Sequence, residues 1–140
     1  VNRDSLVLWT RKFDSIIRPT GARTALFMVW PQGASARGFD AVRTSFQAAA
    51  TAVNGVFLPA GAAWQIALQR DSGLALYGAD DFHPSPLGSY LAAITIYEKL
   101  TGHDARRLPA FAFMNGAALN VPTATVRLLQ GAAHEADTRY

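Results

Sequence analysis

A carboxylate and an imidazole stand three residues apart, at Asp80 and His83, in a segment that the sequence predicts to be a loop. A carboxylate beside an imidazole orients the ring and stabilises its protonated form, which is what a general base requires. The loop leads into a helix with clear start signals, because Ser85 is a good N-cap and Pro86 suits the first helical position. We therefore expect an ordered loop that holds the two side chains in a fixed relation.

This pair belongs to a longer pattern, which consists of Asp80, His83, Pro84 and Gly88, followed by Tyr90 and Ala93. The pattern resembles the last conserved block of the SGNH (GDSL-type) hydrolases, in which an aspartate and a histidine complete a Ser-His-Asp triad. The resemblance implies that His83 takes a proton from a serine hydroxyl, while Asp80 bonds the other ring nitrogen. The family spacing favours Asp80 over its neighbour Asp81 for this role. Chemistry of this kind needs no cofactor.

The resemblance covers only the C-terminal half of such an enzyme, because the chain has neither the Gly-Asp-Ser block nor the Gly-x-Asn-Asp block. SGNH enzymes have a three-layer, flavodoxin-like α/β fold with a five-stranded parallel sheet, and the first strand carries the serine. The resemblance therefore implies that residues 1–140 are a single α/β domain or part-domain. We expect an N-terminal segment or a second chain to supply the serine and the oxyanion donors. The implied reaction is hydrolysis of a carbohydrate ester or another small acyl ester.

The serines inside the chain are weaker candidates for the nucleophile. Ser35 follows a predicted strand and precedes a predicted helix, and Gly33 stands two residues before it, as in a Gly-x-Ser-x-Gly elbow. Arg37 fills the last glycine position, where a tight turn needs a small residue. Ser85 and Ser89 are explained more simply as a cap and a helix-surface residue. We expect the isolated chain to have little or no esterase activity.

Two aromatic residues are candidates for contact with the substrate. Trp30 ends a predicted strand, and ligands bind at the carboxyl ends of strands in open α/β sheets. Phe82 lies between Asp80 and His83, where it could wall a pocket for the acyl or the alcohol group. Core packing is the alternative interpretation of Trp30, as it is of Trp64.

Acidic residues and histidines leave a metal site as an alternative to the triad. The candidate ligands are Asp80, Asp81 and His83 in the loop, then His103, Asp104, His134 and Glu135. These residues do not have a tight ligand spacing such as His-Glu-x-x-His. We therefore expect no metal site, and we interpret His103 and His134 as surface residues.

Helices and apolar strands alternate on both sides of the loop. Helices are predicted at residues 5–17, 39–53, 63–70, 86–100 and 123–136, and strands at 24–30 and 56–59. Successive residues of the strand at 24–30 are apolar, which is typical of a strand buried on both faces of a parallel sheet. Two strands are too few for an independent sheet, so we expect further strands from elsewhere. The alternative is a non-catalytic α/β interaction module that keeps the loop as a relic and works by pairing.

The composition argues against several other classes of protein. Half of the 140 residues are hydrophobic and 16% are charged, as in a chain that folds around a core. The formal net charge is +3, but the basic residues are scattered, so we expect no nucleic-acid partner. There is no cysteine, which excludes disulfides and thiol chemistry. The longest apolar runs are too short to span a membrane, and the sequence identifies no compartment.

Overall fold

A computed structural model describes residues 2–33, 36–111, 113–114 and 117–140. The helices are α1 (Arg3–Ile17), α2 (Ala36–Ala52), α3 (Ala60–Arg70), α4 (Pro86–Thr101) and α5 (Thr123–Arg139), with short 3-10 helices η1 (Arg18–Thr20) and η2 (Ala105–Arg107). The strands are β1 (Ala25–Phe27), β2 (Val56–Leu58), β3 (Phe113–Met114) and β4 (Ala117–Ala118). The chain is therefore a mixed α/β protein, mostly helical, which confirms the α/β class in its broad form. None of the described helices combines the length and the apolar character that a membrane crossing requires.

β1 and β2 form a two-stranded parallel sheet, and α2 is the crossover between them. The register pairs Leu26 with Phe57, and the parallel pairing agrees with the continuous apolar run of the first strand. β1 is shorter than the predicted strand at 24–30, because the chain leaves the ladder toward α3. The carbonyl of Met28 there accepts a hydrogen bond from the main-chain N–H of Gly61. β3 and β4 form a separate antiparallel pair.

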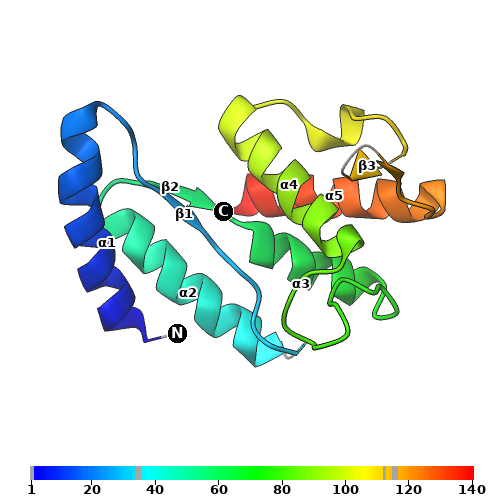
Figure 1. Cartoon of the computed structure of the whole chain (residues 1–140), viewed down its shortest axis with the longest axis horizontal. Coiled ribbons are helices and arrows are strands. Elements are labelled where there is room, and N and C mark those ends of the chain that lie inside the picture. The colour runs from blue at the N-terminus through cyan, green and yellow to red at the C-terminus, as the bar shows by residue number, and fades with distance from the viewer. Residues whose placement is uncertain (1, 34–35, 112, 115–116) are drawn as a thin grey trace.

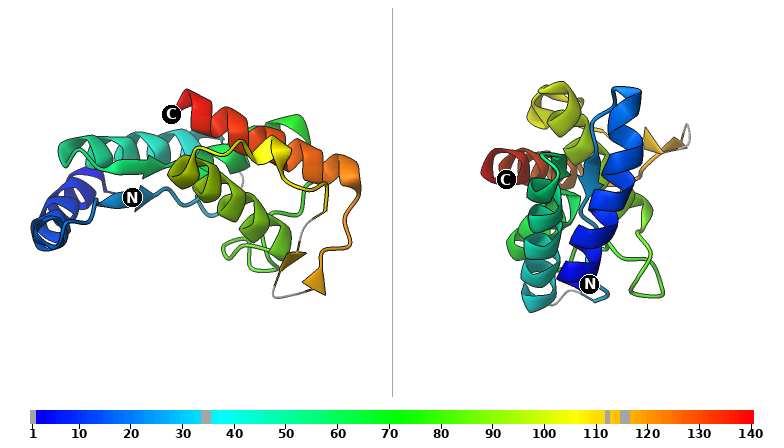
Figure 2. Two further views of the ribbon diagram at one scale, coloured as in Figure 1. Left: turned by 90° about the horizontal axis from the view of Figure 1, so that it is seen from above. Right: turned by 90° about the vertical axis from the view of Figure 1, so that its left-hand side faces the viewer.

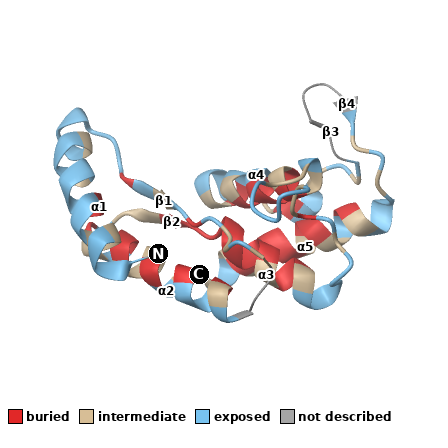
Figure 3. Ribbon diagram, turned by 60° about the horizontal axis from the view of Figure 1, so that its bottom comes forward, coloured by how far each residue is buried: buried red, intermediate tan, exposed pale blue. Residues whose placement is uncertain are grey.

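The molecule is elongated, and β1 and β2 lie between two groups of helices (Figures 1 and 2). α1 packs on α2 at one end, and α3, α4 and α5 pack against one another at the other end. The second group holds much of the buried surface, as Figure 3 shows. Its largest fully buried side chains include Trp64 of α3, Leu91 of α4 and Leu129 of α5. The loop that contains His83 leads directly into α4, so it is attached to the best-packed part of the chain.

Exposed apolar side chains gather on α1 and along β1. These side chains, each between 38% and 69% exposed, are Leu8, Trp9, Phe13 and Ile16 of α1, with Phe27 and Val29. The prediction that the strand at 24–30 is buried on both faces is therefore wrong for the described chain. Met28 packs inward while its neighbours Phe27 and Val29 stay exposed, because no described element covers their face of the sheet.

β1 also has a free edge. Main-chain groups alternate along a strand, so every second residue bonds to the same neighbour. Thr24 and Met28 bond to β2, which turns the N–H and C=O groups of Ala25 and Phe27 toward the opposite edge. Among the described residues, no strand pairs with that edge. The sheet thus has the unpaired edge that the sequence predicts, on the strand that leads to Trp30.

Candidate active site

The structure brings Asp80 and His83 into direct contact. Asp80 Oδ2 lies 2.6 Å from His83 Nδ1, while Oδ1 accepts hydrogen bonds from the main-chain N–H groups of His83 (2.9 Å) and Phe82 (3.1 Å). Asp81 takes a different place in the turn, because its φ of 52° is left-handed and its carbonyl accepts a bond from Gly33. Asp80, rather than Asp81, is therefore the carboxylate that orients the imidazole.

Electrostatics fix the tautomer of His83. The pKa of Asp80 is lowered from 3.8 to about 2, chiefly by the hydrogen bond from the His83 side chain and further by the main-chain donors of His83 and Phe82. An ionised carboxylate only accepts hydrogen bonds, so the proton of the neutral ring sits on Nδ1. Nε2 is left as the basic nitrogen, and the His83 side chain is 74% exposed. The ring is thus accessible to a group that approaches from outside the loop.

Short-range contacts hold both ends of the loop. Ser85 Oγ accepts the N-cap bond from the Gly88 N–H (3.1 Å) and donates to the carbonyl of Ala75 (2.6 Å). The N–H of Gly78 donates to the carbonyl of His83 (2.8 Å), which closes the loop on itself. The predicted capping by Ser85, with Pro86 in the first turn, is confirmed. These bonds fix the main chain on either side of the imidazole.

Aromatic residues tie the loop to the end of β1. Trp30 Nε1 donates to the carbonyl of Phe82 (3.0 Å), and the indole of Trp30 stacks on that of Trp64 at 3.8 Å. Trp64 Nε1 donates in turn to the carbonyl of Gly88 in the first turn of α4 (3.2 Å). The two tryptophans therefore connect the carboxyl end of β1, the loop and α4.

Tyr77 adds a second tie between the same segments. Its hydroxyl lies 2.8 Å from the carbonyl oxygen of Pro31 and 3.1 Å from that of Gly33. Burial raises the pKa of Tyr77 to about 12, so the hydroxyl keeps the proton that it donates. From the sequence alone, Trp64 is expected to pack in the core, and Tyr77 has no assigned role. Their role in positioning the loop depends on partners more than 20 residues away, which no local pattern reveals.

A small apolar pocket opens beside His83. It has a volume of about 210 Å³ and is lined by Val29, Trp30, Phe82, His83 and Pro84. The ring of Phe82 meets the His83 ring edge-on at 5.0 Å and is half exposed. Both residues that the sequence suggested for substrate contact, Trp30 and Phe82, thus lie at the imidazole. Trp30 also donates its hydrogen bond to the loop and stacks on Trp64, so it both lines the pocket and packs against its neighbours.

No serine hydroxyl is hydrogen-bonded to His83 within the described part of the chain. Ser85 Oγ is engaged in the helix cap, with a donor on one side and an acceptor on the other. Ser35, the weaker internal candidate, lies outside the described residues. Among the described residues, the Asp80–His83 pair therefore has no serine hydroxyl as a partner.

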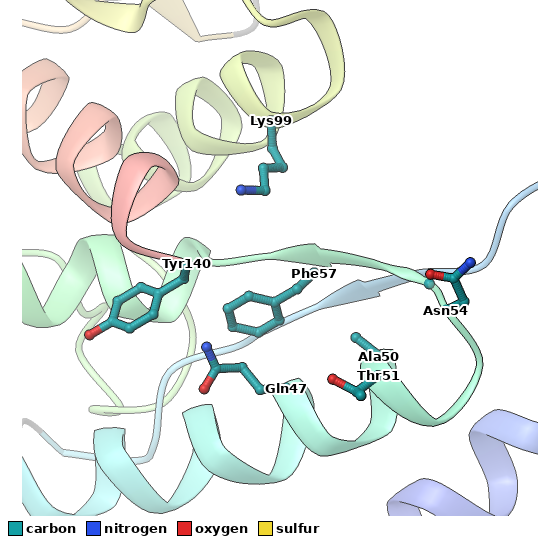
Figure 4. A pocket seen from close by; sticks show the side chains of 8 residues that line it. Gln47, Ala50, Thr51, Asn54, Phe57, Lys99 and Tyr140 are labelled. Atoms are coloured by element: carbon teal, nitrogen blue, oxygen red, sulfur yellow. The ribbon is translucent and has the colours of Figure 1, made fainter.

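A larger hollow lies elsewhere, along β2 (Figure 4). It has a volume of about 650 Å³, and Lys99 of α4 and Tyr140 at the end of α5 face Phe57 of β2 across it. Gln47 of α2 and Asn54 add amide groups to its lining. None of these residues belongs to the His83 loop. The side chains that line this hollow offer two amides, one amine and the hydroxyls of Thr51 and Tyr140, without a paired acid and base.

The metal ligands suggested by the sequence do not gather at the loop. Asp104 and His134 lie together, but their partner is Glu98 of α4, and the three are separate from Asp80 and His83. His134 is not a plain surface residue, because its side chain is 24% exposed and hydrogen-bonded to Glu98. Sequence reasoning missed Glu98, since nothing near it in the sequence marks it as a ligand.

No family model, no curated protein and no solved structure matches this chain. The chemistry of the loop must therefore be inferred from its own residues.

Proposed function

We propose that this chain supplies the acid and the base of an SGNH-like serine esterase. The observation that carries the proposal is the 2.6 Å contact between Asp80 Oδ2 and His83 Nδ1, which leaves Nε2 accessible beside an apolar pocket. This is the arrangement in which a histidine activates a serine, because the carboxylate fixes the tautomer and stabilises the imidazolium that forms.

The reaction proceeds in two halves. His83 Nε2 takes the proton of a serine hydroxyl as its oxygen attacks the ester carbonyl carbon, and Asp80 stabilises the resulting imidazolium. The imidazolium then gives the proton to the leaving alcohol, and an acyl-enzyme remains. Water repeats the sequence with His83 as the base, which releases the acid and restores the serine.

The serine and the oxyanion donors come from an N-terminal segment or a second chain. The free edge of β1 and the exposed side chains of Phe27 and Val29 support this inference. A strand added in parallel at that edge would end on the same side of the sheet as β1, where Trp30 leads into the pocket. Further strands and helices there would complete the three-layer, flavodoxin-like sheet that the resemblance implies.

The substrate class follows from the pocket. Its volume of about 210 Å³ and its apolar wall suit a short acyl group, while the exposed imidazole leaves room for a bulky alcohol. We therefore favour a small acyl ester, including one carried by a carbohydrate. Trp30 and Phe82 are the residues that would contact it.

Ester hydrolysis by the natural gene product, with 4-nitrophenyl acetate as the substrate, tests the proposal. His83→Ala is expected to lower kcat/KM by roughly 10³-fold or more, because the serine loses its base. Asp80→Asn is also expected to lower kcat/KM, because the amide would favour the wrong tautomer of the His83 ring. Asp81→Asn is the matched control, since it makes the same change one residue along at a backbone that suits asparagine, and should retain activity.

Two results would contradict the proposal. Full activity of His83→Ala would exclude His83 as the base. Turnover by the isolated 140-residue chain that is abolished by Ser35→Ala would place the nucleophile within this chain instead.

The exposed apolar surface also favours the second candidate function, a non-catalytic interaction module. Trp9, Phe13 and Ile16 of α1 and Phe27 of β1 would then serve pairing alone. The ester-hydrolysis assay distinguishes the two functions, because an interaction module would form its complex without hydrolysing esters.

A further inference from the structure

A cluster of ionisable side chains joins three segments of the chain. The cluster, here called the Glu98 cluster, consists of Glu98 of α4, Asp104 at the N-cap of η2 and His134 of α5, each of which offers one ligand-type atom. His134 Nδ1 lies 2.7 Å from Glu98 Oε1 and 3.4 Å from Asp104 Oδ1, and the three atoms all lie within 4.8 Å of one another. In a tetrahedral zinc site, ligand atoms lie roughly 3.3 Å apart, so the 3.4 Å pair already has this spacing, whereas the hydrogen-bonded 2.7 Å pair has to open by roughly 0.6 Å when an ion binds.

Outer hydrogen bonds hold the two carboxylates in place. Glu98 Oε2 accepts the main-chain N–H of Ala105 (2.8 Å), which leaves Oε1 for His134. Arg106 bonds Asp104 through its main-chain N–H and its guanidinium, at 2.7 to 3.1 Å. Carboxylates that ligate metals are commonly oriented in this way by neighbouring donors.

A further buried carboxylate follows the cluster on α5. Asp137 lies one turn beyond His134 on α5, and its side chain is nine-tenths buried. Its Oδ1 forms an ion pair with Lys99 Nζ at 3.6 Å. Two carboxyl groups, those of Glu98 and Asp104, thus contact the one imidazole of His134, while Asp137 is paired with Lys99.

We propose that the Glu98 cluster binds a divalent cation of the zinc type, with Glu98 Oε1, Asp104 Oδ1 and His134 Nδ1 as ligands and water in the fourth position. One imidazole nitrogen and two carboxylate oxygens are a ligand set that zinc accepts. The ion takes the place of the proton that Glu98 and His134 share, so binding releases it. The ion ties α4, the segment before η2 and α5 together.

This inference does not rest on the proposed esterase function. Glu98 lies near the end of α4, whereas the His83 loop precedes its start, about 18 Å away along the helix. The ion therefore stabilises the helical group and takes no part in chemistry at His83.

Calorimetric titration of the untagged chain with Zn²⁺ tests the proposal. We expect one equivalent to bind and the melting temperature to rise. His134→Asn and Asp104→Asn should each weaken binding by at least about tenfold. His103→Asn is the matched control, because His103 is an exposed neighbour of Asp104 outside the cluster, and it should bind Zn²⁺ as the parent chain does.

The ring nitrogens of His134 provide a readout that does not depend on variants. Zn²⁺ should shift the ¹⁵N NMR signal of His134 Nδ1 and leave the signals of His83 and His103 in place. Absence of binding, or binding that survives both His134→Asn and Asp104→Asn, would overturn the proposal. A shift of the His83 ¹⁵N signal alone would also overturn the proposal.

Discussion

At the residue scale, one carboxylate both shapes the loop and orients the His83 imidazole. Asp80 Oδ1 accepts the main-chain donors of Phe82 and His83, and Oδ2 accepts the ring proton. Because the pKa of Asp80 is depressed, these bonds favour the folded loop at every pH above the ordinary value of 3.8, and they are lost as the pH falls through about 2. At neutral pH the orienting carboxylate is therefore fully charged.

The link between the two side chains leads to a prediction about titration. His83→Ala should raise the pKa of Asp80 toward 3.8 without reaching it, because the main-chain donors remain. A pH titration of the Asp80 carboxyl ¹³C signal by NMR would measure this change, with His103→Ala as the control that should leave the signal alone. An Asp80 midpoint near 2 in His83→Ala would show that the ring does not hold the carboxylate.

At the element scale, α4 is placed by one glycine of the Asp-x-x-His pattern. A Cβ at Gly88 would lie 2.2 Å from the carbonyl oxygen of Leu76 and 2.4 Å from the ring of Trp64. Real Cβ atoms do not come that close to main chain, so only glycine allows the first turn of α4 to meet Trp64. The glycine thus keeps the helix start, the tryptophan stack and the His83 loop together.

Gly88→Ala should accordingly lower the free energy of unfolding by about 1–3 kcal/mol, because the methyl group forces the helix or the indole to move. Chemical denaturation followed by circular dichroism would measure the loss. Ser89→Ala, at the next helical position, should stay within about 0.5 kcal/mol of the parent. Equal stability of the two variants would show that α4 and Trp64 are not as closely packed as described.

Contacts between residues close in sequence could be predicted from the sequence, whereas contacts between distant elements could not. The Asp80–His83 contact and the Ser85 cap were predictable, because their partners are three residues apart and the turn and cap rules are local. The Trp30 bond to Phe82 spans 52 positions, and the His134 bond to Glu98 spans 36. Contacts of that range arise from helix packing, which no spacing rule encodes.

At the scale of the whole molecule, the two ends differ in how well their apolar side chains are buried. The group of α3, α4 and α5 has a buried core, while α1 and β1 present apolar side chains and a free strand edge. An exposed apolar surface of this kind is typical of interaction sites. The strand with the free edge leads to Trp30 and the pocket, so a partner that binds there would reach His83. The central claim is therefore that this partner carries a serine.

Labelling of the natural gene product with a fluorophosphonate probe tests that claim most directly, because the probe reacts with serines that a base has activated. We predict that the folded protein is labelled on one serine and that His83→Ala abolishes the labelling. Correctly folded material that takes up no probe, or labelling that persists in His83→Ala, would contradict the role proposed for His83.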